Sequence, residues 1–265
     1  STVGVNTMAV DIIPEEKRAQ GMGIYTSSTS LAMAFGPLIS LFMYENNISF
    51  NTIFITVFII GVIGFAHAAS IKTTKGNERS KEKFSPKRLL LKKGIPEACV
   101  MTLLTFGYGI VTVYLSIYAT KEVGISSGVG YYFSIFSAGL VAARLSSSLL
   151  LRGEKFITVL ICGVLALIVA YFIVAFIHNP VAFFSSAIFM GAGYGLISPT
   201  VQTMMINLGK NTERGIANAT YLTFFDLGVG AGVFFGGVIA QYTSYSTTYA
   251  ISLLMTIIGL LYLIF

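Results

Sequence analysis

The sequence predicts an all-α membrane protein, a bundle of helices that each cross the bilayer. Of its 265 residues, 55% are hydrophobic and only 11% are charged, whereas an ordinary soluble domain has about 25% charged residues. The apolar residues gather in stretches of about 20, which is enough for a helix to cross a hydrocarbon core about 30 Å thick. Because lipid offers the backbone no hydrogen-bonding partners, such stretches are expected to be helical.

Eight stretches have the length of a membrane-spanning helix. They cover residues 21–43, 52–70, 95–118, 127–150, 156–177, 181–206, 215–240 and 245–265. The ranges 52–70, 156–177 and 245–265 are nearly featureless, without any Lys, Arg, Asp or Glu, and suit outer, lipid-facing helices. Residues 1–12 add the end of a ninth apolar helix. We interpret the chain as a fragment, because it starts with Ser1 inside an apolar helix and stops without a polar tail.

The basic residues predict the orientation of the helices. Fifteen of the 17 Lys and Arg residues lie in four connections, nine of them within 72–93, whereas the alternate connections contain only Lys121. Because cytoplasmic loops carry the excess of Lys and Arg, we expect the first set, including 72–93, in the cytoplasm. The net charge of +6 therefore reflects topology, and no nucleic-acid partner is expected. Segment 72–93 is the one long polar stretch and predicts a linker that touches anionic lipid.

An internal repeat of 196 residues relates the two ends of the chain. At this offset "NTMAVD" (6–11) aligns with "QTMMIN" (202–207). Small residues coincide too, since Ala32, Gly36 and Ser40 align with Gly228, Gly232 and Gly236. Residues four apart share one helix face, so this stripe allows two helix backbones to approach closely. Both copies adjoin a basic loop, which predicts two parallel halves.

The segment "DIIPEEKRAQGMGIYTSSTSLAMAFGPLIS" resembles the loop into helix five of the major facilitator superfamily, including its drug-antiporter motif of spaced glycines ending in Gly-Pro. The residues that match the motif here are Gly23, Gly36 and Pro37. The copy in the second half supplies Gly228, Gly232 and Gly236 but has Val233 in place of the proline. The resemblance covers the whole chain, from the end of helix four to helix twelve.

The resemblance implies a major facilitator fold of two pseudo-repeated six-helix halves, with the N-terminal helices missing. Residues 1–71 would be the C-terminal part of the first half, 72–93 the cytoplasmic linker, and 94–265 the second half. We expect a monomeric, multi-pass protein of the cell membrane. Its expected partners are a small-molecule substrate, protons and membrane lipid, and no cofactor is expected.

Polar stripes on the predicted helices identify the walls of a cavity, because polar side chains in a membrane usually face the protein interior. The candidate substrate-cavity residues are Asn6, Tyr108, Thr112, Tyr194, Ser198 and Gln202. For each Ser or Thr, the alternative is a hydrogen bond to the backbone of its own helix. The tyrosines are stronger candidates, because aromatic faces bind apolar and cationic solutes.

One carboxylate, Asp226, stands in the middle of the apolar segment 215–240. Twelve residues after Arg214, at about 1.5 Å each, place it roughly 18 Å deep, near the middle of the bilayer. A charge there costs at least about 2.5–3.5 kcal/mol unless it is protonated, hydrated or paired. Arg144 differs from it in depth by only about 6 Å and is the candidate partner. The two could form a permanent ion pair, or Asp226 could exchange Arg144 for a proton or a cationic substrate.

These features predict a secondary active transporter that couples proton entry to efflux of a small amphipathic or cationic compound, as in multidrug resistance. Uptake of a sugar or organic acid by the same fold is the alternative, although a sugar site would need more inward-facing Asn, Gln and Asp. An enzyme would need a His, Asp or Cys constellation, and the two histidines and two cysteines lie far apart in sequence. We therefore predict neither an enzyme nor a metal site, and a receptor that does not transport is the remaining alternative.

Overall fold

The computed structural model describes Ser28, Ala32 and residues 35–70, 90–150, 156–209 and 213–264. A helical segment occupies residues 35–45. The longer helices are α3 (Phe50–Ala69), α4 (Ile95–Tyr118), α5 (Gly130–Leu150), α6 (Phe156–Phe176), α7 (Pro180–Leu208), α8 (Arg214–Tyr242) and α9 (Tyr245–Ile264). These bounds lie within a few residues of the predicted spans, so the all-α membrane bundle is confirmed.

Six of the described helices are long and apolar enough to cross a membrane, namely α3, α4 with its short extensions, and α6 to α9. Helix α5 has 21 residues but is not among them. Its sequence explains the difference, since Ser134, Ser137 and Arg144 interrupt the apolar residues. Polar residues of this kind are tolerated in a spanning helix where they face the protein rather than lipid.

Local signals set several helix ends. Ser49 caps α3 by accepting a hydrogen bond from the Thr52 backbone N–H at 3.3 Å. Asn179 caps α7 in the same way, and Pro180 follows at the first helical position, where no N–H donor is needed. Asn47 has a left-handed backbone with φ 58°, and such a residue ends a helix, here segment 35–45.

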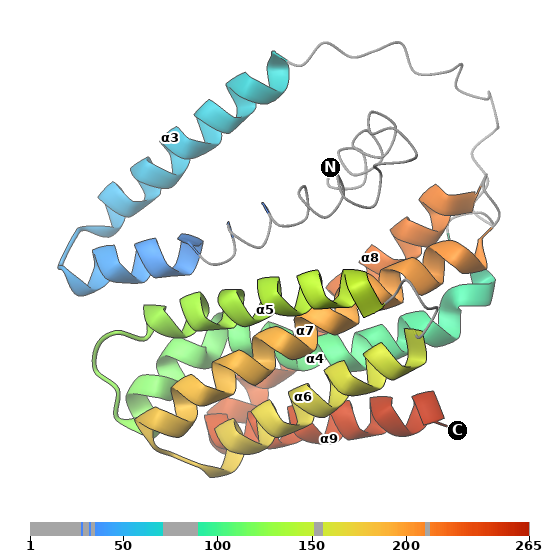
Figure 1. The fold of residues 1–265 in the computed structure, drawn as a ribbon. Helices are drawn as coiled ribbons and strands as arrows, with labels where there is room; N and C mark the ends of the chain where they lie inside the picture. The colour runs from blue at the N-terminus through green and yellow to red at the C-terminus, as the bar shows by residue number, and fades with distance from the viewer. Residues whose placement is uncertain are drawn as a thin grey trace.

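Helices α4 to α9 pack as one bundle (Figure 1). Helix α7 lies between α5 and α6, while α4 packs against α8 and α9. Helix α3 has no buried residue and lies apart from the bundle in Figure 1, which agrees with its expected outer position. The core that fixes the candidate site is therefore formed by α4, α5, α7 and α8.

Glycines bring the helix backbones of this core together. The predicted stripe of Gly228, Gly232 and Gly236 faces α4, where added side chains would collide with Thr105, Phe106 and Ile110. The stripe thus packs against a helix of the same bundle. Around Gly36, in contrast, nothing lies within 4 Å of an added Cβ.

Helix α9 differs from the expectation that residues 245–265 are a nearly featureless, lipid-facing helix. Thr248, Ser252 and Thr256 lie fully inside the bundle. Each hydroxyl donates a hydrogen bond to a carbonyl oxygen of its own helix, over 2.6–2.9 Å. Satisfied in this way, small hydroxyl side chains can pack like apolar ones, and the face that they form is buried against α4 and α6.

Candidate functional site

The centre of the bundle holds a cluster of aromatic rings contributed by four helices. Tyr108 of α4 lies edge-on to Tyr194 of α7, with ring centroids 4.9 Å apart. Phe225 of α8 lies 6.0 Å from Tyr108, and Phe136 of α5 lies 6.4 Å from it. Rings at these separations attract each other through their edges and faces. Tyr108 is therefore the residue on which the four helices converge.

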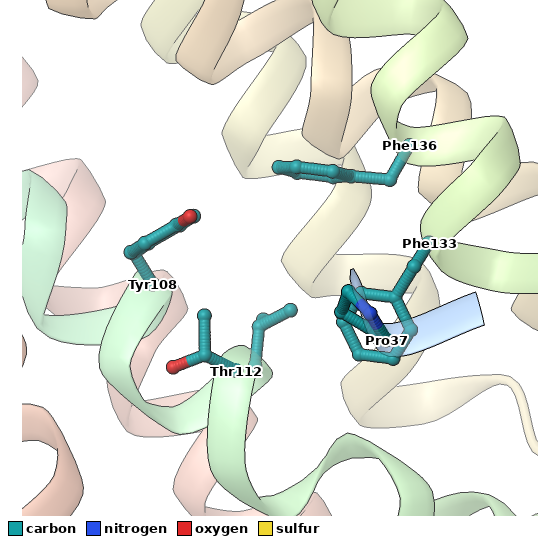
Figure 2. A pocket seen from close by; sticks show the side chains of 6 residues that line it. Pro37, Tyr108, Thr112, Phe133 and Phe136 are labelled. Carbon is teal, nitrogen blue, oxygen red and sulfur yellow. The ribbon is translucent and has the colours of Figure 1, made fainter. Parts of the chain in front are cut away.

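A cavity of about 160 Å³ adjoins Tyr108. Its lining residues are Pro37, Tyr108, Val111, Thr112, Phe133 and Phe136. Figure 2 shows Tyr108 and Thr112 of α4 on one side of this space and Phe133 and Phe136 of α5, with Pro37, on the other. Pockets for drug-sized ligands have volumes of about 300–1,000 Å³, so this cavity is smaller than a usual pocket for such a ligand.

Two of the predicted cavity residues, Tyr108 and Thr112, thus line the same space, together with Pro37 of the predicted antiporter-type motif. The Thr112 hydroxyl donates to the Gly109 carbonyl of its own helix at 2.9 Å. This is the alternative considered for every Ser and Thr in the sequence. Thr112 accordingly presents its methyl group and a satisfied hydroxyl to the neighbouring space.

Tyr194 is buried, with only 2% of its surface exposed, and its hydroxyl is engaged within the protein. It donates a hydrogen bond to the Leu104 carbonyl oxygen at 2.9 Å. The Tyr171 hydroxyl lies 2.6 Å away and must be the donor of that second bond, because Tyr194 has one proton to give. Because its hydroxyl is engaged, Tyr194 presents its aromatic ring to the centre of the bundle.

Arg144 and Asp226 both lie near one side chain, that of Tyr221 in α8. The Tyr221 side chain interacts electrostatically with both charges and lies near the Ser198 side chain. Arg144 also interacts with Tyr108. The structure therefore gathers the predicted residues Arg144, Asp226, Ser198 and Tyr108 around one edge of the aromatic cluster.

Asp226 occupies the middle of α8, as expected, on the face turned away from α4. It precedes Gly228 by two residues, which corresponds to about 200° around a helix with 3.6 residues per turn. The side chain is exposed in the described bundle. A mid-helix carboxylate on this face is accessible to a ligand or a proton that reaches the bundle surface.

Some of the remaining predicted residues lie within the described part of the chain and others outside it. Gln202 of α7 donates a hydrogen bond to the Asn218 side chain of α8 at 2.7 Å, which links the two helices near Arg214. Asn6 and Gly23 lie outside the described residues. Within the described ranges, no group of three or more His, Cys, Asp or Glu side chains could hold a metal ion.

Sequence reasoning missed the phenylalanines of the site, Phe133, Phe136 and Phe225. They lie on helices rich in apolar residues, so no polar stripe marks them. It also did not assign Tyr221 to the site. Tyr221 lies five residues before Asp226, about 140° around the helix, so the two residues lie on different sides of α8. Helical spacing from Asp226 therefore could not have identified this residue.

Comparison with known proteins decides the family. The family model described as "Major Facilitator Superfamily" matches residues 1–208 and 153–265. The chain belongs to the Major Facilitator Superfamily. It is therefore a multi-pass membrane protein, and its superfamily consists of transporters rather than enzymes. The resemblance stated from the sequence is confirmed.

Two curated members of the superfamily are similar to this chain. A "Staphylopine export protein" of Staphylococcus aureus is 23% identical over 266 residues, which cover 94% of this chain and 66% of the relative. An "Uncharacterized MFS-type transporter YtbD" of Bacillus subtilis is 24% identical over 260 residues, which cover 89% of this chain and 61% of the relative. The chain thus spans less than two thirds of the length of these superfamily relatives.

Proposed function

We propose that this Major Facilitator Superfamily chain is part of a secondary active transporter that exports a small amphipathic or cationic compound in exchange for protons. The observation that carries the proposal is the placement of Arg144 and Asp226, on two different helices, beside Tyr221. Export, rather than uptake, is supported by the relative named as an export protein. The proposal specifies the chemical class of the compound and no individual compound.

The proposed organisation follows from the repeat. Residues 1–71 belong to one helical half, 94–265 form the second half, and 72–93 connect them on the cytoplasmic side. Transport then consists of one half rocking against the other, with the ligand held near the middle of the bilayer. We propose that the transporter acts as a monomer, since the site draws on residues of a single chain.

Aromatic rings and one carboxylate suit a cationic ligand with an apolar body. Tyr108, Phe136 and Phe225 offer ring faces and edges, and cations are attracted to such faces. Asp226 would neutralise the ligand's charge. A carboxylate in an apolar setting holds either a proton or a cationic partner, because an isolated charge there is costly.

The coupling step is an exchange of partners at Asp226. When the carboxylate is deprotonated it is stabilised by Arg144 or by a cationic ligand, and when it is protonated it needs neither. Proton binding therefore releases the ligand, and proton loss on the other side restores the charged state. Tyr221 interacts electrostatically with both charges, which supports this exchange of partners.

The experiment is transport of ethidium, a lipophilic cation, into inside-out membrane vesicles containing the intact protein. Asp226→Asn should abolish accumulation driven by a pH gradient while leaving ethidium binding and passive exchange measurable. Glu213→Gln is the matched control, since it removes a carboxylate at the start of the same helix, 13 residues before Asp226. This variant should transport normally.

Two results would refute the proposal, one for the coupling role of Asp226 and one for the direction of transport. The first is Asp226→Asn protein that pumps ethidium against a gradient with unchanged pH dependence, which would leave the carboxylate a purely architectural partner of Arg144. The second is ethidium moving outward from the vesicles with the proton gradient in the wild type, which would favour an uptake symporter. Measurement with and without an uncoupler separates these cases from simple leakage.

A further inference from the structure

A second cavity, of about 310 Å³, lies between helical segment 35–45 and the start of α5. Its lining residues are Leu38, Ile39, Phe42, Glu45, Gly128, Gly130 and Tyr131. None of them lines the cavity beside Tyr108. Its volume reaches the lower end of the range of about 300–1,000 Å³ that is usual for small-molecule pockets. It is also at the end of the bundle that the basic residues predict to face outward.

The carboxylate of Glu45 is held at the wall of this cavity by a specific turn. One carboxylate oxygen, Oε1, accepts a hydrogen bond from the backbone N–H of Gly128 at 2.9 Å. Gly128 has a left-handed backbone with φ +79°, which is readily adopted by glycine. An added Cβ there would also lie 3.3 Å from the Tyr131 ring. The turn thus fixes the carboxylate and the Tyr131 ring relative to each other.

The second Glu45 oxygen and two aromatic rings give this cavity its chemical character. Glu45 is the one charged residue in its lining. Phe42 and Tyr131 are each 62% exposed, so their faces are open to a ligand, and the other side chains in the lining are aliphatic. A carboxylate beside aromatic faces favours a cation with an apolar body and disfavours an anion.

We propose that this outer cavity, defined by Phe42, Glu45 and Tyr131, is a second binding site for an organic monocation with an aromatic body. The cation binds beside the Glu45 carboxylate and stacks on the two rings. The cation meets the second carboxylate oxygen, so the contact of Glu45 Oε1 with the Gly128 N–H is kept. The site goes beyond the proposed transport function and requires neither Asp226 nor proton coupling.

The test uses a cysteine at the cavity wall of the intact, purified protein. Ile39 is 48% exposed, so Ile39→Cys should react with a maleimide. Methyltriphenylphosphonium should slow that reaction, and triphenylphosphine oxide, which is similar in size but neutral, should not. Adding Glu45→Gln should weaken protection by the cation about fivefold, the upper range for loss of one exposed ion pair. Glu213→Gln is the control, because that carboxylate, at the start of α8, does not line this cavity.

Protection that depends on the positive charge and on Glu45 supports the site. Equal protection by the phosphine oxide, no protection at all, or full protection in the Glu45→Gln protein would overturn it. If Glu45→Gln does not fold, the comparison of the two phosphorus compounds on Ile39→Cys alone decides the matter. Asp226→Asn should leave the protection unchanged, so failure of the proposed coupling mechanism and failure of this site are separate results.

Discussion

Gly232 of α8 lies directly against the carbonyl oxygen of Phe106 in α4, with no room for a side chain between them. Beside this contact, the hydroxyl groups of Thr102 and Tyr114 each donate a hydrogen bond to an α8 carbonyl oxygen at 2.9 Å. The two helices are therefore joined over several turns. As a result, Tyr108 on α4 and Asp226 on α8 are carried by one rigid pair of helices.

The first prediction concerns this contact. Gly232→Ala should destabilise the folded protein by about 1–3 kcal/mol, the usual cost of overpacking a tight interior. Gly230 is the matched control, because nothing lies within 4 Å of the Cβ that an alanine would add there. Gly230→Ala should be neutral or stabilise the helix by up to about 1 kcal/mol. Thermal unfolding of both variants in detergent gives the comparison, and equal unfolding temperatures would contradict the close packing.

The second prediction separates the ring of Tyr194 from its hydroxyl. Tyr194→Phe removes the side-chain hydrogen bond to the buried Leu104 carbonyl, which keeps its helical donor, and leaves the Tyr171 hydroxyl without its acceptor. The free energy of unfolding should fall by about 1–3 kcal/mol, with little change in ethidium affinity. Tyr242→Phe, at a position 81% exposed, should change neither quantity. A large loss of affinity with unchanged stability would instead make the hydroxyl a ligand contact.

The third prediction concerns the outer end of α9. Glu122 accepts hydrogen bonds from the backbone N–H groups of Tyr245 at 2.7 Å and Ser246 at 3.0 Å, and so caps this helix from the end of α4. Glu122→Gln removes one of the two acceptor oxygens and the charge that opposes the helix dipole, at a cost of about 1–2 kcal/mol. Hydrogen exchange should accelerate at the first turn of α9 and stay unchanged at the first turn of α7, which Asn179 caps. Unchanged exchange in α9 would refute the cap.

The fourth prediction concerns orientation. A cysteine at Asn46, which is exposed in the turn before α3, should react with a membrane-impermeant maleimide added outside intact cells. A cysteine at Ser80, within the linker predicted to be cytoplasmic, should react only after the membrane is opened. The expectation follows from the distribution of Lys and Arg. The reverse labelling pattern would invert the topology and place the cavity beside Glu45 on the cytoplasmic side.

The helices were predictable from the sequence, because a hydrocarbon core leaves no other stable backbone structure for apolar stretches. The polar stripes were less informative. Tyr108 and Thr112 do line a common space, yet the Thr112 and Thr105 hydroxyls are engaged by carbonyl oxygens of their own helix. Polar residues four positions apart show which side chains share a helix face. They do not show whether that face contacts another helix, a cavity or lipid.

The sequence by itself determined the all-α membrane fold, the position of Asp226 in the middle of its helix and the glycine stripe that permits close packing. Only the tertiary structure decided that Tyr108, Phe136, Tyr194 and Phe225 meet from four helices, and that Glu45 reaches the backbone of Gly128 from 83 residues away. The physical reason is that hydropathy and helical periodicity are local properties of the chain. Which faces come together depends on the rotation and crossing of whole helices, and these are set by packing among residues distant in sequence.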